Sequence, residues 1–237
     1  MASLHHHFEA LITNINPSQE RRATAVRIPR QLRDWLRDHE FATRSPHTRL
    51  SGSYRRQTAV GDIKDVDILL FVPETELDRT PNAVLQEVKG ILDDYPCATA
   101  SASPQRRSVH LDLESDDLQI DIVPAILENG LRKSLCIPDR PTAEWIASDP
   151  LGYQRRLSKS NRTYGRKLVP LIKLVKAWRN AQMTYRRPKS YALEIMTLYA
   201  VEGGHVELAD RGWGRILADL FEYFDNEYSV FLDSTSD

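Results

Sequence analysis

The sequence lacks long apolar runs, is poor in cysteine and shows no enrichment in glycine or proline. No stretch approaches the roughly 18 consecutive apolar residues of a membrane-spanning helix, so we expect no contact with a membrane. The 10 glycines and 13 prolines among 237 residues are too few for a fibrous or disordered chain. With 41% hydrophobic and 27% charged residues, the composition indicates a globular protein that is long enough to bury a core.

Two further absences concern the compartment. The only two cysteines, Cys97 and Cys136, stand in no spacing typical of a metal or redox site. The N-terminal residues lack the basic segment and apolar stretch of a secretory signal. Together these features predict a cytoplasmic protein.

The formal net charge of −1 conceals a strong alternation of charge along the chain. Residues 1–64 and 131–192 are basic overall, whereas residues 65–130 and 193–237 are acidic. An acidic block beside a basic block suits a site that binds cations and polyanions together. Charge alone favours a simpler interpretation, in which the basic and acidic blocks form solvated surfaces that pair with each other.

Hydrophobic periodicity predicts strands in the middle of the chain and helices toward both ends. We expect a buried strand over 66–72 and a hairpin formed by 109–113 and 118–122. The expected helices cover 4–15, a stretch capped by Asn16 and running toward Glu40, 83–93, much of 141–165, 170–182, 190–202 and 213–225. This order predicts an α+β fold in which a sheet lobe packs against a helical lobe.

A first motif combines a Gly-Ser turn, Gly52-Ser53, with two acidic residues, Asp65 and Asp67. A glycine turn lets backbone N–H groups approach a phosphate closely, and the serine hydroxyl adds a donor. Asp65 and Asp67 point to the same face of the predicted strand, where two carboxylates repel unless a divalent cation binds them. An exposed strand end with solvated acids is an equally good interpretation of the pair alone.

A third acidic residue, Asp121, interrupts the apolar stretch LQIDIVP at 118–124. We expect this stretch to pair beside the first strand, which would bring Asp121 to the other two carboxylates and complete a two-metal site. Nearby acids have simpler explanations, because Asp116 and Asp117 fall in the predicted hairpin turn.

The helix expected over 170–182 has an apolar stripe on one side and two lysines, Lys173 and Lys176, on the other. The lysines lie about one turn apart and could clamp a triphosphate. For an isolated helix, solvated lysines are the favoured interpretation.

Taken together, these motifs resemble the polymerase-beta-type nucleotidyltransferase superfamily. The resemblance rests on Gly52-Ser53 followed by Asp65-Val66-Asp67. The length of the segment between them, residues 54–64, is within the superfamily's usual range. LIKLVKAW at 171–178 and SYALE at 190–194 are similar to the helical lobe of oligoadenylate synthetase and cyclic GMP-AMP synthase-like enzymes. In bacteria these are the CD-NTases of CBASS anti-phage systems, which also carry the SMODS nucleotidyltransferase domain.

The resemblance implies a metal-dependent enzyme. Asp65, Asp67 and Asp121 would bind two Mg²⁺ ions, for which Mn²⁺ can substitute, and Asp121 would help activate the acceptor hydroxyl. The implied activity joins ATP and other NTPs, with release of pyrophosphate, into a cyclic or linear oligonucleotide. This second messenger would activate a downstream effector, and nucleic acid is not expected as a partner.

The resemblance also assigns the nucleotide contacts. Gly52 and Ser53 would hold the donor triphosphate together with Lys176. Lys173 would contact the acceptor nucleotide, whereas Ser190 and Tyr191 would lie against a nucleotide, with the tyrosine ring available for stacking.

The implied organisation is a catalytic lobe over 1–140 and a helical lobe over 141–237. Relatives extend further after the SYALE-type helix, so we expect a helical lobe that is either minimal or truncated. Two other functions stay open: a primer-dependent nucleotidyltransferase that acts on DNA or RNA ends, and a non-catalytic nucleotide-binding module.

Overall fold

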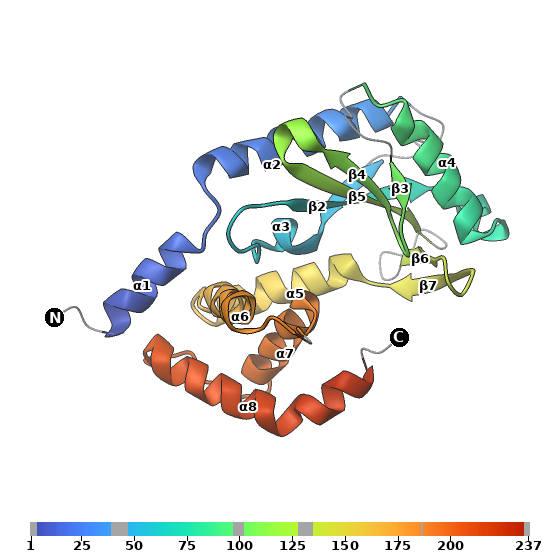
Figure 1. The fold of residues 1–237 in the computed structure, drawn as a ribbon. Helices are drawn as coiled ribbons and strands as arrows, with labels where there is room; N and C mark the ends of the chain where they lie inside the picture. The colour runs from blue at the N-terminus through green and yellow to red at the C-terminus, as the bar shows by residue number, and fades with distance from the viewer. Residues whose placement is uncertain (1–3, 39–46, 97–101, 128–134, 186, 235–237) are drawn as a thin grey trace. The chain divides into compact units, whose positions relative to one another are not determined.

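A computed structural model of the chain describes residues 4–38, 47–96, 102–127, 135–185 and 187–234. The chain forms two compact units, one built around a sheet and one built from helices (Figure 1). The sheet unit comprises Ser18–Arg56 and Asp62–Tyr153. The helical unit comprises Met1–Pro17, Gln57–Gly61 and Gln154–Asp237. The units therefore interleave along the sequence, and the lobe boundary expected at residue 140 stays a prediction.

The sheet unit is organised around a mixed seven-stranded sheet. Its strands are β1 (Thr48–Ser51), β2 (Asp65–Val72), β3 (Ser103–Pro104), β4 (Val109–Leu113), β5 (Leu118–Ile126), β6 (Leu135–Asp139) and β7 (Glu144–Ser148). The main order is β1-β2-β5-β4-β3, and β6 joins β5 to β7. Only β2 and β5 pair in parallel, and all other described pairs are antiparallel.

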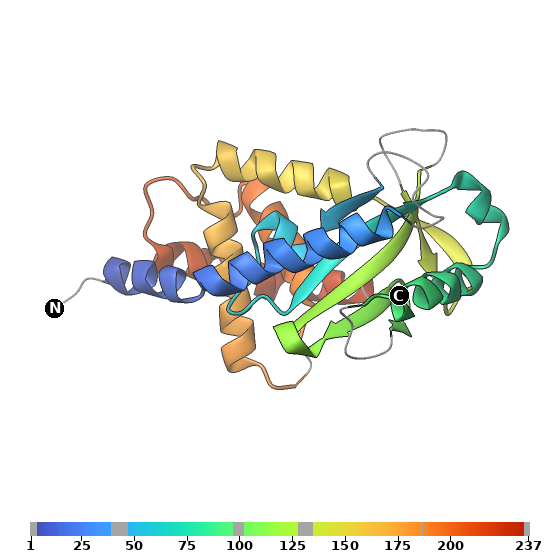
Figure 2. The ribbon, with the colours of Figure 1, turned by 90° about the horizontal axis from the view of Figure 1, so that it is seen from above.

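Helices α2 (Gln19–Leu36) and α4 (Pro81–Asp93) lie on the same side of this sheet, as the views in Figures 1 and 2 show. Residues at helical spacing along α2, including Leu32 and Leu36, are buried, and this stripe explains why the helix docks. The short helix α3 (Gly52–Arg56) follows β1 directly. The 3₁₀ turns η1 (Glu74–Asp78) and η2 (Glu114–Asp116) complete the connections.

The helical unit contains α1 (Leu4–Asn14), α6 (Leu168–Gln182), α7 (Ser190–Glu202), α8 (Trp213–Ser234) and most of α5 (Pro150–Thr163). Helix α6 packs against α7, and α8 packs against α1, α6 and α7. The indole Nε1 of Trp213 donates to Glu9 at 2.7 Å and ties α8 to α1. In the part of the chain that the structure describes, no helix is long and apolar enough to cross a membrane.

The α+β class, the central strand, the hairpin and the helices predicted over 170–182 and 190–202 are confirmed. The helix expected over 141–165 is wrong in its first part, where β7 pairs with β6 before α5 begins at Pro150. All five residues of β6 are buried, so this strand lacks the alternation by which strands are recognised. Cys136 lies buried in it, and Cys97 lies outside the described residues.

The cap predicted for the second helix is also wrong. Ser18, not Asn16, caps α2, because its side chain accepts a hydrogen bond from the backbone N–H of Arg21 at 3.1 Å. Asn16 stays with the preceding helix, where its side-chain amide donates to the carbonyl of Ile12 at 2.9 Å.

Candidate active site

Three aspartates lie on the two central strands of the sheet unit. Asp65 and Asp67 are on β2 and Asp121 is on β5. The parallel register pairs Asp67 with Asp121 directly, and it pairs Asp65 with Gln119. Register partners on neighbouring strands share a face, as do residues i and i+2 on one strand. The pairing of the two strands that the sequence predicted is thus found, and it brings the three acids to one face.

The aspartates belong to a polar row that crosses the sheet. Ser51 on β1 pairs with Asp67, Asp67 with Asp121, Asp121 with His110 on β4, and His110 with Ser103 on β3. The register places these polar residues at the same level of their strands. The candidate active site therefore lies along this row, because the strand register places these side chains next to one another.

Sequence reasoning missed His110 and Ser108, which both contact Asp121. The Nδ1 atom of His110 lies 3.1 Å from Oδ1 of Asp121, and the hydroxyl of Ser108 donates to the same oxygen at 3.4 Å. A usable signal was present, because counting outward from the predicted turn at 114–117 pairs His110 with Asp121. These contacts fix the orientation of the third carboxylate.

The Gly52–Ser53 turn lies directly against Asp67. Gly52 has φ +68°, a left-handed conformation that favours glycine, and a Cβ there would lie 1.6 Å from Oδ2 of Asp67. The position therefore excludes any side chain on both conformational and steric grounds. Ser53 follows on α3 and is partly exposed. The structure thus brings together two predicted features, the glycine turn and the second aspartate.

Negative charge accumulates at this face of the sheet. The pKa of Asp67 is raised to about 6, first by burial and then by the nearby charges of Asp121 and Asp65, whereas Arg56 partly opposes this shift. The pKa of Asp65 is also raised, first by burial and then by Asp121. Carboxylates that destabilise one another's charged form are the arrangement that a bound cation relieves.

The chemistry of this donor set fits a divalent cation. Hard cations such as Mg²⁺ take carboxylate oxygens, and the Asp67–Asp121 pair supplies them from adjacent strands. Among the residues that the structure describes, no group of three or more His, Cys, Asp or Glu side chains is close enough to hold a metal ion by itself. The carboxylates would therefore need further oxygen ligands, such as substrate phosphates, or a small rearrangement.

Arg21, near the start of α2, holds the segment that leads into β2. Its guanidinium donates to the carbonyl of Ile63 at 2.7 Å and to the carbonyl of Asp116 at 3.0 Å. Asp117 adopts φ +46° in the hairpin turn and pairs with Arg21 at 3.4 Å. Asp116 and Asp117 therefore serve the turn and its ion pairs, as their positions predicted.

The two lysines of α6 lie in the helical unit and are both buried. Lys173 is 8% exposed and donates to the side chain of Asn16 at 2.6 Å. Lys176 is 3% exposed and pairs with Glu194 of α7. The interpretation of these lysines as solvated is therefore wrong, because each side chain is enclosed by partners of its own unit.

Lys176 belongs to a small buried network with Glu194 and Thr58. Its ammonium donates to the carbonyl of Thr58 at 3.0 Å, and the Thr58 hydroxyl donates to Glu194 at 2.8 Å. A buried ion pair is stable only when further hydrogen bonds satisfy its atoms, and Thr58 supplies them here. The network joins α6 and α7 to residues 57–61.

Ser190 and Tyr191 begin α7 in the same unit. Ser190 is partly exposed, and Tyr191 is 47% exposed, so its ring is accessible to a ligand. Their roles in nucleotide binding, like those of Lys173 and Lys176, stay predictions.

Known families match most of this chain. The model of the Second Messenger Oligonucleotide or Dinucleotide Synthetase (SMODS) domain matches residues 1–161. The chain belongs to the SMODS family. The C-terminal domain 2 of 2'-5'-oligoadenylate synthetase 1 matches residues 153–211 of this SMODS chain. The resemblance predicted from the aspartate motif and the two helical stretches is thereby confirmed.

Two curated relatives are cyclic nucleotide synthases by name. A cyclic AMP-AMP-AMP synthase of Acinetobacter sp. is 30% identical over 234 residues, which cover 94% of the SMODS chain and 65% of the relative. A cyclic AMP-AMP-GMP synthase of Enterobacter hormaechei is 25% identical and is covered over 69% of its length. The SMODS chain thus spans just under two thirds of the Acinetobacter protein.

Solved structures share the fold. The CD-NTase CdnG of Bradyrhizobium diazoefficiens, solved in complex with GTP, matches with a TM-score of 0.74 at 18% identity. The match covers 95% of the SMODS chain and 76% of the CdnG chain. The Escherichia coli MS115-1 CdnC structure with ATP has a TM-score of 0.71 at 20% identity, with coverages of 94% and 72%.

Proposed function

We propose that the SMODS chain is a nucleotidyltransferase that joins NTPs into a cyclic or linear oligonucleotide second messenger. The observation that carries this proposal is the in-register pair of Asp67 and Asp121, with the glycine turn at Gly52 packed against Asp67. The names of the curated relatives support the same reaction class. A role in CBASS anti-phage defence, through an effector that the product activates, belongs to this proposal.

In the proposed reaction, a hydroxyl of the acceptor ribose attacks the α-phosphorus of a donor NTP. The hydroxyl proton passes to the Asp121 carboxylate as the new oxygen–phosphorus bond forms, the bond from the α-phosphorus to the α–β bridging oxygen breaks, and pyrophosphate leaves. Asp65, Asp67 and Asp121 would hold two Mg²⁺ ions, or Mn²⁺, which supply charge neutralisation at the phosphates and lower the pKa of the attacking hydroxyl. His110 and Ser108 keep Asp121 oriented.

The remaining contacts are proposed for binding. Gly52 offers close approach of the backbone, and Ser53 offers a hydroxyl, to the donor triphosphate. In the helical unit, we propose that Lys173, Lys176, Ser190 and Tyr191 bind nucleotide. For Lys176, this role would require the ammonium to exchange part of its network with Glu194 and Thr58 for phosphate oxygens.

The test is incubation of the chain with all four labelled NTPs and Mg²⁺ or Mn²⁺, followed by phosphatase digestion. We expect a phosphatase-resistant product without any primer, and no product from an Asp65→Ala/Asp67→Ala variant. Asp62→Asn, at an exposed acid outside the row, is the matched control and should retain the product. A product that forms only after DNA or RNA primers are added would contradict the proposal and favour the primer-dependent alternative.

A further inference from the structure

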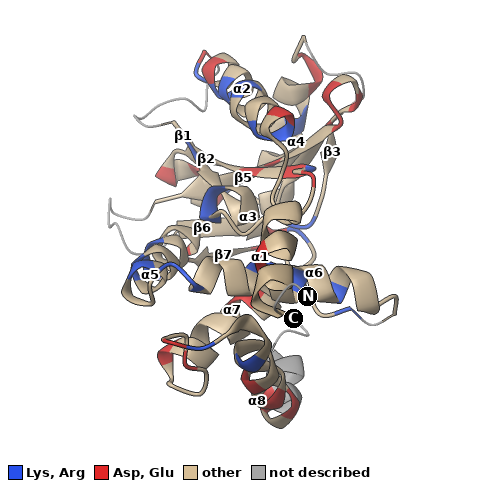
Figure 3. Ribbon diagram, turned by 90° about the vertical axis from the view of Figure 1, so that its left-hand side faces the viewer, with Lys and Arg blue, Asp and Glu red and all other residues tan. Residues whose placement is uncertain are grey.

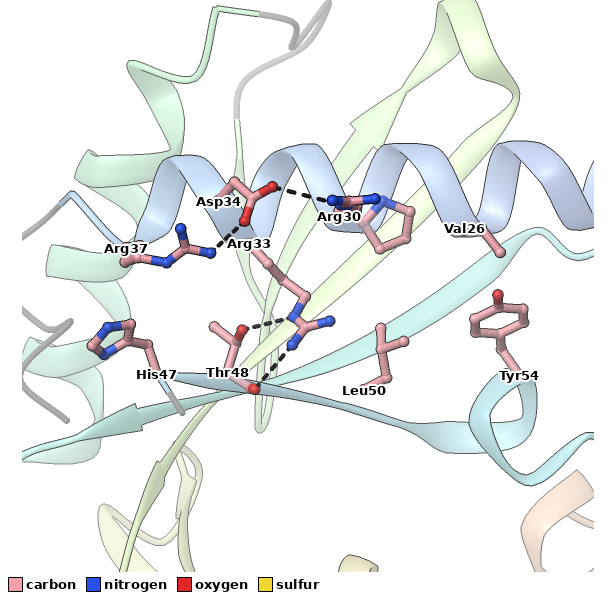
Figure 4. A pocket seen from close by; sticks show the side chains of 10 residues that line it. Val26, Arg30, Arg33, Asp34, Arg37, His47, Thr48, Leu50 and Tyr54 are labelled. Atoms are coloured by element: carbon pink, nitrogen blue, oxygen red, sulfur yellow. Dashed lines mark hydrogen bonds and ion pairs between the residues drawn. The ribbon is translucent and has the colours of Figure 1, made fainter. Parts of the chain in front are cut away.

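A second candidate site lies within the sheet unit, away from the aspartates. A cavity of about 610 Å³ opens between α2 and β1, and Figure 4 shows side chains from both elements and Tyr54 of α3 around it. Sites for small molecules typically have volumes of roughly 300–1,000 Å³. The cavity is therefore large enough for a ligand of nucleotide size.

The cavity lies on the opposite face of the sheet from the aspartates. Thr48 and Leu50 of β1 line it, and they alternate with Ser51, which pairs with Asp67 in the polar row. Since successive side chains of a strand point to opposite faces, Leu50 and Ser51 face away from each other. The cavity is thus separated from the proposed catalytic carboxylates by the thickness of the sheet.

One end of the cavity is cationic. Arg30, Arg33 and Arg37 line it along one side of α2, and Asp34 is the one carboxylate among the lining residues. Basic positions along α2 are visible in blue in Figure 3. Asp34 pairs with both Arg30 and Arg37, so a single negative charge is shared by two guanidinium groups. The lining therefore carries an excess of positive charge.

Two hydrogen bonds to Thr48 orient the guanidinium of Arg33 in the cavity. Its Nε donates to the Thr48 hydroxyl at 2.7 Å and its Nη2 to the Thr48 carbonyl at 3.2 Å, which leaves Nη1 outside these two bonds (Figure 4). Burial lowers the pKa of Arg33, and the charge of Arg37 lowers it further, although Asp34 opposes both effects. An anion bound here would relieve this cost.

His47 supplies the independent indication of a missing partner. It lines the same end of the cavity as Arg37, and its Nδ1 is buried without a hydrogen-bond partner among the described residues. A buried polar atom without a partner costs free energy, typically about 1–3 kcal/mol. A ligand oxygen could satisfy this nitrogen when it carries a proton.

The other end of the cavity is apolar. Val26, Leu50 and Tyr54 lie at the end away from Arg37 and His47 (Figure 4). Val26 is 58% exposed, which leaves apolar surface for a ligand to cover. The cavity therefore combines an apolar end with a guanidinium-rich end.

We infer that this cavity binds a nucleoside diphosphate or a related nucleotide, with its base against Val26, Leu50 and Tyr54 and its phosphates at the arginines. Two or more negative charges match the charge excess, and guanidinium groups bind phosphate oxygens in paired hydrogen bonds. Tyr54 directly follows Ser53, so the bound nucleotide contacts the helix that carries the Gly52–Ser53 turn. The inferred nucleotide site thus lies on the opposite face of the sheet from the aspartates.

The test is calorimetric titration of the chain with ADP in the presence of EDTA. Under the proposed function, binding at the aspartates needs divalent ions, so EDTA removes that contribution, and the loss in Arg37→Gln assigns the remaining binding to the cavity. Failure of this inference is thereby distinguished from failure of the catalytic proposal. We expect one metal-independent site, and Arg37→Gln should weaken ADP binding about tenfold, as for loss of one charge-assisted hydrogen bond.

Arg27→Gln is the matched control, because Arg27 lies on the same helix outside the cavity, is 54% exposed against 55% for Arg37, and likewise loses one surface ion pair. It should leave ADP affinity unchanged. Val26→Asp, at an exposed position, should weaken ADP but leave inorganic pyrophosphate less affected. Absence of metal-independent binding, or equal losses in Arg37→Gln and Arg27→Gln, would overturn the inference.

Discussion

The Nδ1 atom of His110 lies 3.1 Å from Oδ1 of Asp121, across the β4–β5 pair that places both side chains at the same level of the sheet. This contact makes His110 a positioning residue for the third carboxylate. Groups that orient metal ligands typically contribute roughly 10–100-fold to metal affinity or activity.

His110→Ala should therefore reduce the rate of product formation about 10–100-fold and raise the Mn²⁺ concentration needed for half-maximal binding. His110→Asn, whose amide can donate a hydrogen bond to Asp121, should recover part of both. Mn²⁺ binding can be followed by electron paramagnetic resonance. His7→Gln, at an exposed histidine of α1, is the control, and equal Mn²⁺ affinity in wild type and His110→Ala would contradict this role.

Gly52→Ala tests the contact between the turn and Asp67. The added Cβ would overlap the Asp67 carboxylate, so the turn or the aspartate must move. A displacement of about 1 Å at reacting groups can cost about a hundredfold in rate. Gly61→Ala has almost the same φ, +67° against +68°, but open space around it, so it isolates the backbone strain. Similar activity in both variants would show that the Asp67 contact is unimportant.

The raised pKa of Asp67 predicts a pH-dependent stability. Because this pKa is about 6 in the folded chain and lower in the unfolded chain, the folded state keeps a proton that the unfolded state releases between about pH 4 and pH 6. The contribution of Asp67 to stability therefore falls as the pH rises through this window, by up to about 3 kcal/mol.

Asp67→Asn removes this titration, and its free energy of unfolding should exceed that of the wild type by more at pH 7.5 than at pH 4.5. Urea unfolding at the two pH values measures the difference. Mg²⁺ at pH 7.5 should stabilise the wild type and not the variant, while Asp62→Asn should behave as the wild type. A pH difference of the opposite sign would refute the electrostatic account.

Substitutions in the buried pair of Lys176 and Glu194 test whether Lys176 serves stability, nucleotide binding or both. Lys176→Met leaves the Glu194 carboxylate buried without the cation that it pairs with, which should cost about 3–5 kcal/mol of unfolding free energy. Lys176→Met/Glu194→Leu should restore most of that stability without restoring activity, if Lys176 binds nucleotide. Lys159→Met, at an exposed lysine of α5, is the control. Full activity of the stable double variant would limit Lys176 to a structural role.

Features encoded by local patterns could be predicted from the sequence. The alternation around Asp121 and the apolar run after Asp65 defined β5 and β2, and their adjacency followed from the chemistry of the acids. The continuous burial of β6 hid it, because a strand buried at every position has no period. The burial of Lys176 depends on Glu194 and Thr58, which are distant in sequence, so no local pattern could indicate it.

The most direct test of the central claim is the rate of pyrophosphate release from NTPs, compared between wild type, Asp67→Asn and Asp62→Asn at saturating Mg²⁺. If the in-register pair of Asp67 and Asp121 forms the reaction centre, Asp67→Asn should lose at least about a hundredfold in rate. Asp62→Asn should match the wild type. Undiminished pyrophosphate release by a folded Asp67→Asn variant would contradict the account.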